Sequence, residues 1–279
     1  MTHRVRAHRR TAILVNRPAR ITRLAAIVSS LVGALLLSAC GAVSTAISST
    51  TSLGSRDSTL ALAGKVVGID PGHNGRNYLH TGFINHQVFN GRTNENCDTT
   101  GTSTNGGYSE SLFNFNVARY LRADLLATGA HVVMTRSTNQ GVGPCIDRRA
   151  QILNHAHVNV AIDIHADGAP SWGRGFAILE PVTDEINKHI VASSLLFGAD
   201  VRSSMLAQTP MPVSNYDGVN GFKFRSDLAG LNLATEPKVL IECGNMRNAR
   251  DGALLTSPAF QKRIALALSI AITNFLTNK

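Results

Sequence analysis

The chain has 279 residues, with 27 lysines and arginines against 18 aspartates and glutamates, for a formal charge of +9. Seven of the arginines lie within the first 23 residues, and the rest of the chain holds 20 basic residues against 18 acidic ones. We therefore expect no nucleic-acid partner, because such proteins carry a basic patch on the folded domain. A hydrophobic content of 43% with 16% charged residues excludes an intrinsically disordered chain.

The N-terminus has the composition of an export signal. Its arginine-rich start is followed by 14 uncharged residues from Leu24 to Leu37, fewer than the ~20 that a membrane-spanning helix needs. A basic segment ahead of a short apolar stretch is typical of a secretory signal. We expect residues 1–40 to be a signal sequence and the protein to be exported to the cell envelope, either to the periplasmic space or to the outer face of the cytoplasmic membrane.

The end of this segment, Leu37-Ser-Ala-Cys40-Gly41, resembles the lipobox of bacterial lipoproteins. The resemblance implies that Cys40 is lipidated and anchors the protein to a membrane. Ordinary cleavage at a small residue, with no lipid on Cys40, is the alternative. Residues 41–63 are rich in Ser, Thr and Gly and predict a flexible tether, so that one folded domain occupies residues 64–279.

Strand and helix patterns alternate along this domain. A β-branched run over 65–69 predicts a strand, and a turn at 70–73 leads into a long loop over 74–107 that has no helical period. The remaining elements are a helix that begins within 109–112 and runs up to Gly129, a strand at 131–135, a helix at 146–155, strands at 158–164 and 175–182, a helix at 185–208, a strand at 237–242, and helices at 247–255 and 257–276. This order predicts a single α/β domain with a mostly parallel, twisted β-sheet and helices on both faces.

The cysteines indicate one disulfide bond. Export permits disulfides, and Cys97 and Cys145 both lie in polar, turn-rich segments, whereas Cys243 lies in an apolar strand. We therefore predict a Cys97–Cys145 bond, which would close a loop of about 48 residues and stabilise the domain by roughly 4 kcal/mol in the chain-entropy model. Free thiols at all three positions are the alternative.

Chemistry-bearing side chains follow three of the predicted strands. His73, His165 and Glu242 each stand at a strand end, where sites form in open α/β sheets, and Glu110 opens the helix after the long loop. Two histidines and one carboxylate form a catalytic zinc site when a second carboxylate serves as the base. Each residue taken alone also fits a structural role. The sequence contains neither His-Glu-x-x-His nor Gly-x-Ser-x-Gly, which argues against a helix-borne metalloprotease site and against a serine hydrolase.

Four ordered motifs resemble a known family. They are Asp70-Pro-Gly-His73, the helix-opening Glu110, Ile164-His-Ala-Asp167 and Val239-Leu-Ile-Glu-Cys-Gly244, and they look like those of the zinc-dependent N-acetylmuramoyl-L-alanine amidases of the third amidase family, over Lys65 to Asn274. The resemblance implies that His73, Glu110 and His165 hold one zinc ion per chain and that Glu242 is the catalytic carboxylate.

The resemblance also implies a function. The protein would hydrolyse the amide bond between N-acetylmuramic acid and L-alanine in peptidoglycan or muropeptides. Separately, we expect the chain to be a monomer. Two alternatives stay open: a non-catalytic peptidoglycan-binding envelope lipoprotein, and a zinc carboxypeptidase that acts on muropeptide stems.

Some positions depart from the family or have no assigned role. The family usually has Ser and Asn where this chain has Asp163 and Asp167, and often has Phe where Asn245 stands. Asp70 either orients His73 or caps the turn. Lys223 and Arg225 lie in a basic stretch that either meets peptide carboxylates or, as we favour, forms a solvated face.

Overall fold

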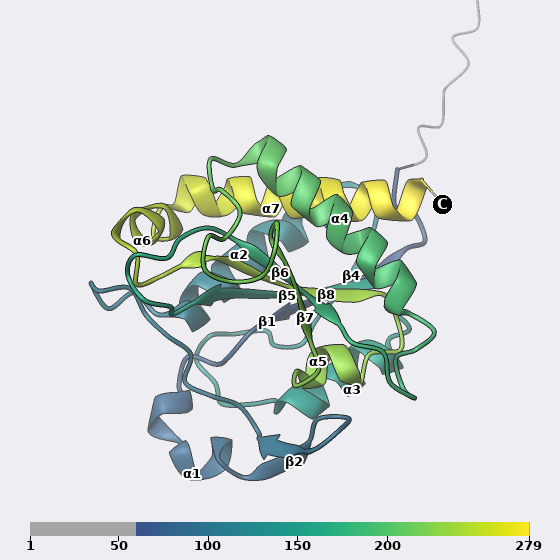
Figure 1. Ribbon diagram of the computed structural model, residues 1–279. Coiled ribbons are helices and arrows are strands. Elements are labelled where there is room, and N and C mark those ends of the chain that lie inside the picture. The colour runs from purple at the N-terminus through teal and green to yellow at the C-terminus, as the bar shows by residue number, and fades with distance from the viewer. Residues whose placement is uncertain (1–59, 279) are drawn as a thin grey trace, which may run out of the picture. The chain divides into compact units, whose positions relative to one another are not determined.

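The computed structural model describes residues 60–278 and contains the predicted α/β sheet (Figure 1). Six strands lie in the order β4-β1-β5-β8-β6-β7, and all neighbouring pairs are parallel except β6 with β8. The strands are β1 (Val66–Pro71), β4 (His131–Met134), β5 (Val160–Asp167), β6 (Ala177–Pro181), β7 (Phe222–Arg225) and β8 (Lys238–Asn245). The central strands β1, β5 and β8 are covered on both faces, which explains their nearly continuous apolar sequences.

Helices cover both faces of the sheet, as predicted. The long helices α2 (Glu110–Ala127), α4 (Val191–Gln208) and α7 (Pro258–Thr277) pack together on one face, and α3 (Ile146–His155) and α5 (Ala229–Asn232) lie on the other (Figure 1). The main hydrophobic core lies between the sheet and the three long helices. A further helix, α6 (Ala249–Leu255), follows β8. Within residues 60–278, none of the helices is both long and apolar enough to cross a membrane.

Local signals fix where α2 begins and ends. The hydroxyl of Ser109 accepts a hydrogen bond from the backbone N–H of Leu112, which satisfies one of the free donors of the first turn. Gly129, which follows α2, has a positive φ of 89° that favours glycine after a helix. These signals place Glu110 in the first turn of the helix, with its carboxylate at the edge of the sheet.

The segment from 74 to 107, predicted as a loop without regular structure, contains short elements. They are a 3-10 turn (η1, Asn77–Leu79), α1 (Thr81–Ile84) and an antiparallel hairpin of β2 (Gln87–Phe89) and β3 (Asn94–Asn96). The hairpin tip is held by distant residues, because Arg92 donates to the carbonyl of Val182 and Asn232 donates to the carbonyl of Asn90. Such long-range bonds leave no periodic signal in the sequence. The short elements β7 and α5 were not predicted either.

The structure contains the expected disulfide between Cys97 and Cys145, whose Cα atoms lie 4.6 Å apart. The bond joins the end of the hairpin segment to the residue that precedes α3. Cys243 is buried and free.

The folded domain begins slightly before residue 64. Leu62, at the end of the predicted tether, is fully buried and donates its backbone N–H to the carbonyl of Thr128. The predicted signal sequence over 1–40, with its lipidation site at Cys40, lies outside the described residues.

Candidate active site

The predicted site residues converge at the carboxyl ends of the central strands. His73 follows β1, His165 lies on β5 and Glu242 lies on β8. His165 and Glu242 are register partners across the two parallel strands, so their side chains stand next to each other on the same face of the sheet. This is the edge at which parallel α/β sheets form their sites.

His73, Glu110 and His165 form a compact cluster. One oxygen of Glu110, Oε1, lies 3.3 Å from Nε2 of His73 and 2.9 Å from Nδ1 of His165. The two imidazole rings meet edge to face with their centroids 4.8 Å apart. One potential ligand atom from each residue lies within 4.8 Å of the other two, so a single ion could contact all three side chains.

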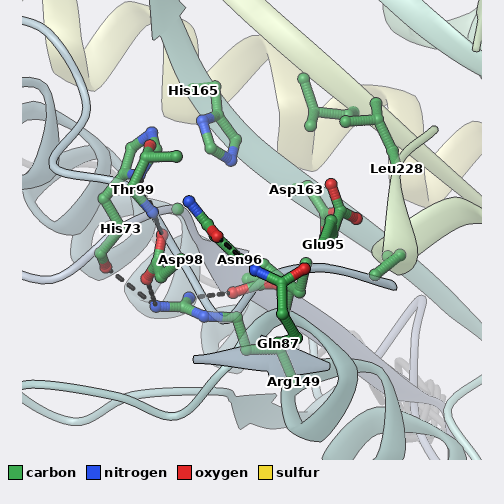
Figure 2. Close-up of a pocket in the computed structure, with 16 residues that line it drawn as sticks. His73, Gln87, Glu95, Asn96, Asp98, Thr99, Arg149, Asp163, His165 and Leu228 are labelled. Atoms are coloured by element: carbon green, nitrogen blue, oxygen red, sulfur yellow. Dashed lines mark hydrogen bonds and ion pairs between the residues drawn. The ribbon is translucent and has the colours of Figure 1, made fainter. Parts of the chain in front are cut away.

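The backbone and ring of His73 are both fixed by neighbours. Its φ is +57°, in the left-handed region that non-glycine residues seldom adopt. Arg149 on α3 stabilises this conformation by donating from Nη2 to the carbonyl of His73 at 2.9 Å (Figure 2). The carboxylate of Asp98 lies 3.1 Å from Nδ1 of the ring. Because a carboxylate accepts hydrogen bonds, it places the ring proton on Nδ1 and leaves Nε2 free to act as a ligand.

Two glycines allow the ligands to approach the backbone. A Cβ on Gly72 would lie 2.0 Å from Nε2 of His165, which is closer than any real contact. A Cβ on Gly101, whose φ is +68°, would lie 2.8 Å from both Oε2 of Glu110 and Cδ2 of His73. Any side chain at Gly72 would therefore displace the imidazole of His165.

The electrostatics of the cluster favour a cation. Burial lowers the pKa of His73, but Glu110 and Asp98 outweigh it and raise this pKa to about 10. Burial raises the pKa of Glu110, yet the two histidines hold it well below its ordinary value. The carboxylates that stabilise a protonated imidazole here would equally stabilise a metal ion, whose binding releases that proton.

The cluster also fits zinc by the chemistry of its donors. Two imidazole nitrogens and one carboxylate are the ligand set of a catalytic zinc site, with a coordination position left for water. A second group, His86 with Cys97 and Cys145, also satisfies the distance criterion within residues 60–278. Its sulfurs are joined in the disulfide and are not available as thiolate ligands.

Glu242 has the surroundings of a proton-transfer group. Burial, with the negative charges of Glu110 and Asp167, raises its pKa well above the ordinary value. Its Oε2 is buried and makes no hydrogen bond with the rest of the described chain. A buried carboxylate oxygen of this kind is available to accept or donate a proton.

The sequence did not predict Asp98 as a site residue. It offered Asp70 instead as the residue that orients His73. The carboxylate that contacts the His73 ring is that of Asp98, whereas Asp70 accepts a hydrogen bond from Thr135 and pairs with Nη1 of Arg149 at 2.6 Å. The one sequence signal for Asp98 is its position directly after the disulfide residue Cys97.

The three departures from the family pattern have structural partners. Asp163 forms a buried ion pair with Lys238 at 2.8 Å. Asp167 accepts a hydrogen bond from the backbone N–H of Gly168. Asn245 is fully buried and donates to the carbonyls of Pro170 and Gly173, so it fixes the loop that follows β5.

Comparisons with known proteins agree with this geometry. A family model described as N-acetylmuramoyl-L-alanine amidase matches residues 67–274. An N-acetylmuramoyl-L-alanine amidase of Mycobacterium tuberculosis is 40% identical over 219 residues, which are 78% of this chain and 89% of that protein. The crystal structure of an N-acetylmuramyl-L-alanine amidase from Mycobacterium smegmatis has a TM-score of 0.73 at 38% identity and covers 78% of this chain and 99% of its own. The apo structure of the amidase from Mycobacterium abscessus has a TM-score of 0.72 at 40% identity, covering 77% of this chain and 100% of its own.

Proposed function

Because the chain belongs to the N-acetylmuramoyl-L-alanine amidase family, we propose that it hydrolyses the bond between N-acetylmuramic acid and L-alanine with one zinc ion held by His73, Glu110 and His165. The observation that carries the zinc proposal is the convergence of these three side chains beside Glu242. When bound, zinc supplies a Lewis acid that polarises the amide carbonyl and lowers the pKa of water.

In the proposed mechanism, Glu242 moves the proton. It accepts a proton from the attacking water, whose oxygen adds to the amide carbonyl carbon of the lactyl group. It then donates this proton to the nitrogen of L-alanine as the carbon–nitrogen bond breaks. The products are a lactyl carboxylate on the glycan and a peptide with a free amine. The raised pKa of Glu242 supports this role, because it makes the protonated form, which must donate to the leaving amine, easier to reach than for an ordinary carboxylate.

The other residues of the site hold the reacting groups in place. Asp98 orients the imidazole of His73, and Arg149 holds the backbone of His73. Gly72 keeps the space that His165 needs. These side chains and this glycine would act through the ligands and not on the substrate itself.

Product analysis tests the proposal. We expect zinc-loaded protein to release from muropeptides a peptide that begins with L-alanine, leaving the glycan intact, as identified by mass spectrometry. A chelator should abolish the release, and added zinc should restore it. Release of a C-terminal amino acid would instead identify a carboxypeptidase, and unchanged substrate would identify a binding protein.

A further inference from the structure

Two cavities adjoin the candidate reaction centre. The hairpin-side cavity, of about 530 Å³, lies between the β2–β3 hairpin, α3 and α5 and is bordered by His73 and His165 (Figure 2). The β7-side cavity, of about 170 Å³, is lined by Glu242 together with residues of β7 and of the preceding loop. Since two of the proposed metal ligands border one cavity and the proposed base borders the other, a bond cleaved at this site would lie between the two cavities.

The β7-side cavity contains two cations with free hydrogen-bond donors. Lys223 and Arg225 stand two residues apart on β7, so both point to the same face of the sheet. Nζ of Lys223 contacts Asp217, and Arg225 uses Nε and Nη2 on Asp227. An ammonium group has three donors and a guanidinium has five, so each cation keeps donors for a ligand while its acidic partner holds it in place.

The hairpin-side cavity offers no such cation. Apart from the proposed metal ligands His73 and His165, the one basic side chain in its lining is Arg149, and all the donors of this guanidinium already have partners. Its donors reach the carboxylates of Asp70 and Asp98 and the carbonyls of Pro71, His73 and Pro144. The hairpin contributes the uncharged amides of Gln87 and Asn96 and the carboxylate of Glu95, as Figure 2 shows. This lining suits the hydroxyl and amide groups of a sugar and disfavours an anion.

The two halves of a muramoyl-peptide also differ in charge. With its lactyl group in amide linkage, the muramoyl half carries no charge. The peptide half carries a carboxylate on the residue after L-alanine, and cleavage gives it an amine as well. The β7-side cavity has acceptors for that amine in Asp167 and Glu242, beside the two cations.

We therefore propose that the stem peptide occupies the β7-side cavity, with the carboxylate after L-alanine bound by Lys223 and Arg225, and that the muramoyl group occupies the hairpin-side cavity. This orientation rests on the proposed amidase function. It replaces our expectation that Lys223 and Arg225 form a solvated face, and it makes them determinants of specificity.

Two substrates that differ by a single charge test the orientation. They are N-acetylmuramoyl-L-alanyl-D-glutamate and N-acetylmuramoyl-L-alanyl-D-isoglutamine, both with the γ-carboxylate blocked as a methylamide, so that only the α-carboxylate of the first distinguishes them. In Lys223→Met and Arg225→Met, KM for the acidic substrate should rise about tenfold, because a hydrogen bond to a charged group is lost. The kcat should change little, since the carboxylate is bound equally before and during the reaction. For the amide substrate, both constants should change less than about threefold.

Matched variants separate recognition from a structural effect. Lys223→Arg should recover the preference for the acidic substrate, because it keeps the charge. Lys188→Met should behave as wild type, since Lys188 is an exposed lysine paired with Glu185 at 2.8 Å and lines neither cavity. In calorimetric titrations, the product dipeptide L-alanyl-D-glutamate with its γ-carboxylate blocked as a methylamide should bind the wild type more tightly than it binds Lys223→Met.

The outcomes distinguish the two proposals. Wild-type protein that cleaves neither substrate would overturn the amidase proposal and the orientation with it. The orientation alone would be overturned if the wild type cleaves both substrates while the Lys223 and Arg225 variants lose kcat/KM equally for both substrates or for neither.

Discussion

Glu110 and Glu242 are both buried glutamates at the same edge of the sheet, yet their neighbours give them different chemistry. Glu110 lies within 3.3 Å of two imidazole nitrogens, which hold its pKa well below the ordinary value. Glu242 has carboxylates as neighbours, and together with burial they raise its pKa. The first environment suits a permanently ionised ligand and the second suits a proton carrier.

Substituting each glutamate should therefore separate metal binding from proton transfer. Glu110→Ala should purify with little zinc and no activity, because it removes one of three protein ligands. Glu242→Gln should keep about one zinc per chain and lose activity by ~10²–10⁴-fold, the range typical of a general acid–base group. Zinc content by atomic emission and turnover of a muramoyl-peptide measure the two effects. A Glu242→Gln protein without zinc, alongside a Glu110→Ala protein with zinc, would exchange the two roles.

A single methyl group at Gly72 should also disable the site. In Gly72→Ala the new Cβ would lie 2.0 Å from Nε2 of His165, so the ring must shift from the position in which its Nδ1 meets Glu110. We expect weak zinc binding and at least a tenfold loss of activity, since displacement of a reacting group by about 1 Å can cost ~10²-fold. Gly82→Ala is the control, because no atom lies within 4 Å of a Cβ at this position. Equal activity in both variants would show that His165 tolerates displacement.

At the scale of the elements, one buried charge cluster joins three of them beneath the site. Asp70 at the end of β1 contacts Thr135 after β4 and Arg149 on α3. Burial raises the pKa of Asp70, but the charges of Arg149 and Lys238 and the hydrogen bonds from Thr135 and Arg149 outweigh it and lower the pKa to about 2. The elements that position His73 are thus held together by an ionised carboxylate.

This cluster predicts how stability depends on pH. The pKa of Asp70 is lower in the folded chain than its ordinary value of 3.8, so its ionisation stabilises the fold above pH 3.8, and this contribution fades as the pH falls toward 2. The difference between the two pKa values corresponds to about 2 kcal/mol. Urea unfolding should show Asp70→Asn less stable than wild type by about this amount at pH 7, with the difference shrinking below pH 4.

A surface carboxylate serves as the control for this experiment. Glu185 is almost fully exposed, with a side-chain exposure of 92%, and pairs with Lys188 on the surface. Glu185→Gln should change stability by less than ~1 kcal/mol at any pH. If the Asp70→Asn deficit stayed constant down to pH 2, the ionisation of Asp70 would not be its source.

At the scale of the whole molecule, the folded domain and the N-terminus have separable roles. The described residues contain every proposed ligand and the proposed base, whereas the signal sequence lies outside them. We propose that residues 1–40 direct export and that a lipid on Cys40 holds the domain at a membrane. The domain would then act on peptidoglycan from the envelope side.

Cys40→Ala tests the anchor. The variant should move from the membrane fraction to the soluble envelope fraction, because the lipid and its contact with the bilayer are lost. Its turnover of a soluble muramoyl-peptide should equal that of the wild type. Unchanged fractionation would refute lipidation at Cys40 and leave export itself unaffected.

The sequence by itself determined the periodic elements and the residues at their ends. The central strands carry continuous apolar runs, and α2 and α3 were predicted within two residues of their observed bounds. His73, His165 and Glu242 could be found because parallel strands bring their carboxyl ends to one edge whatever the details of packing. Cys97 and Cys145 could be paired because the third cysteine of the domain lies in a buried strand.

Only the tertiary structure decided the rest, because its signals are contacts between distant residues. The hairpin over 87–96 is held by Val182 and Asn232, and it would not be stable as an isolated two-stranded ribbon. Asp98 reaches His73 across 25 positions of the chain through a folded loop that has no period of its own. The saturation of Arg149 and the free donors of Lys223 and Arg225 depend on which carboxylates the fold brings to each cation. Residue types alone do not distinguish a structural arginine from one that is available to bind substrate.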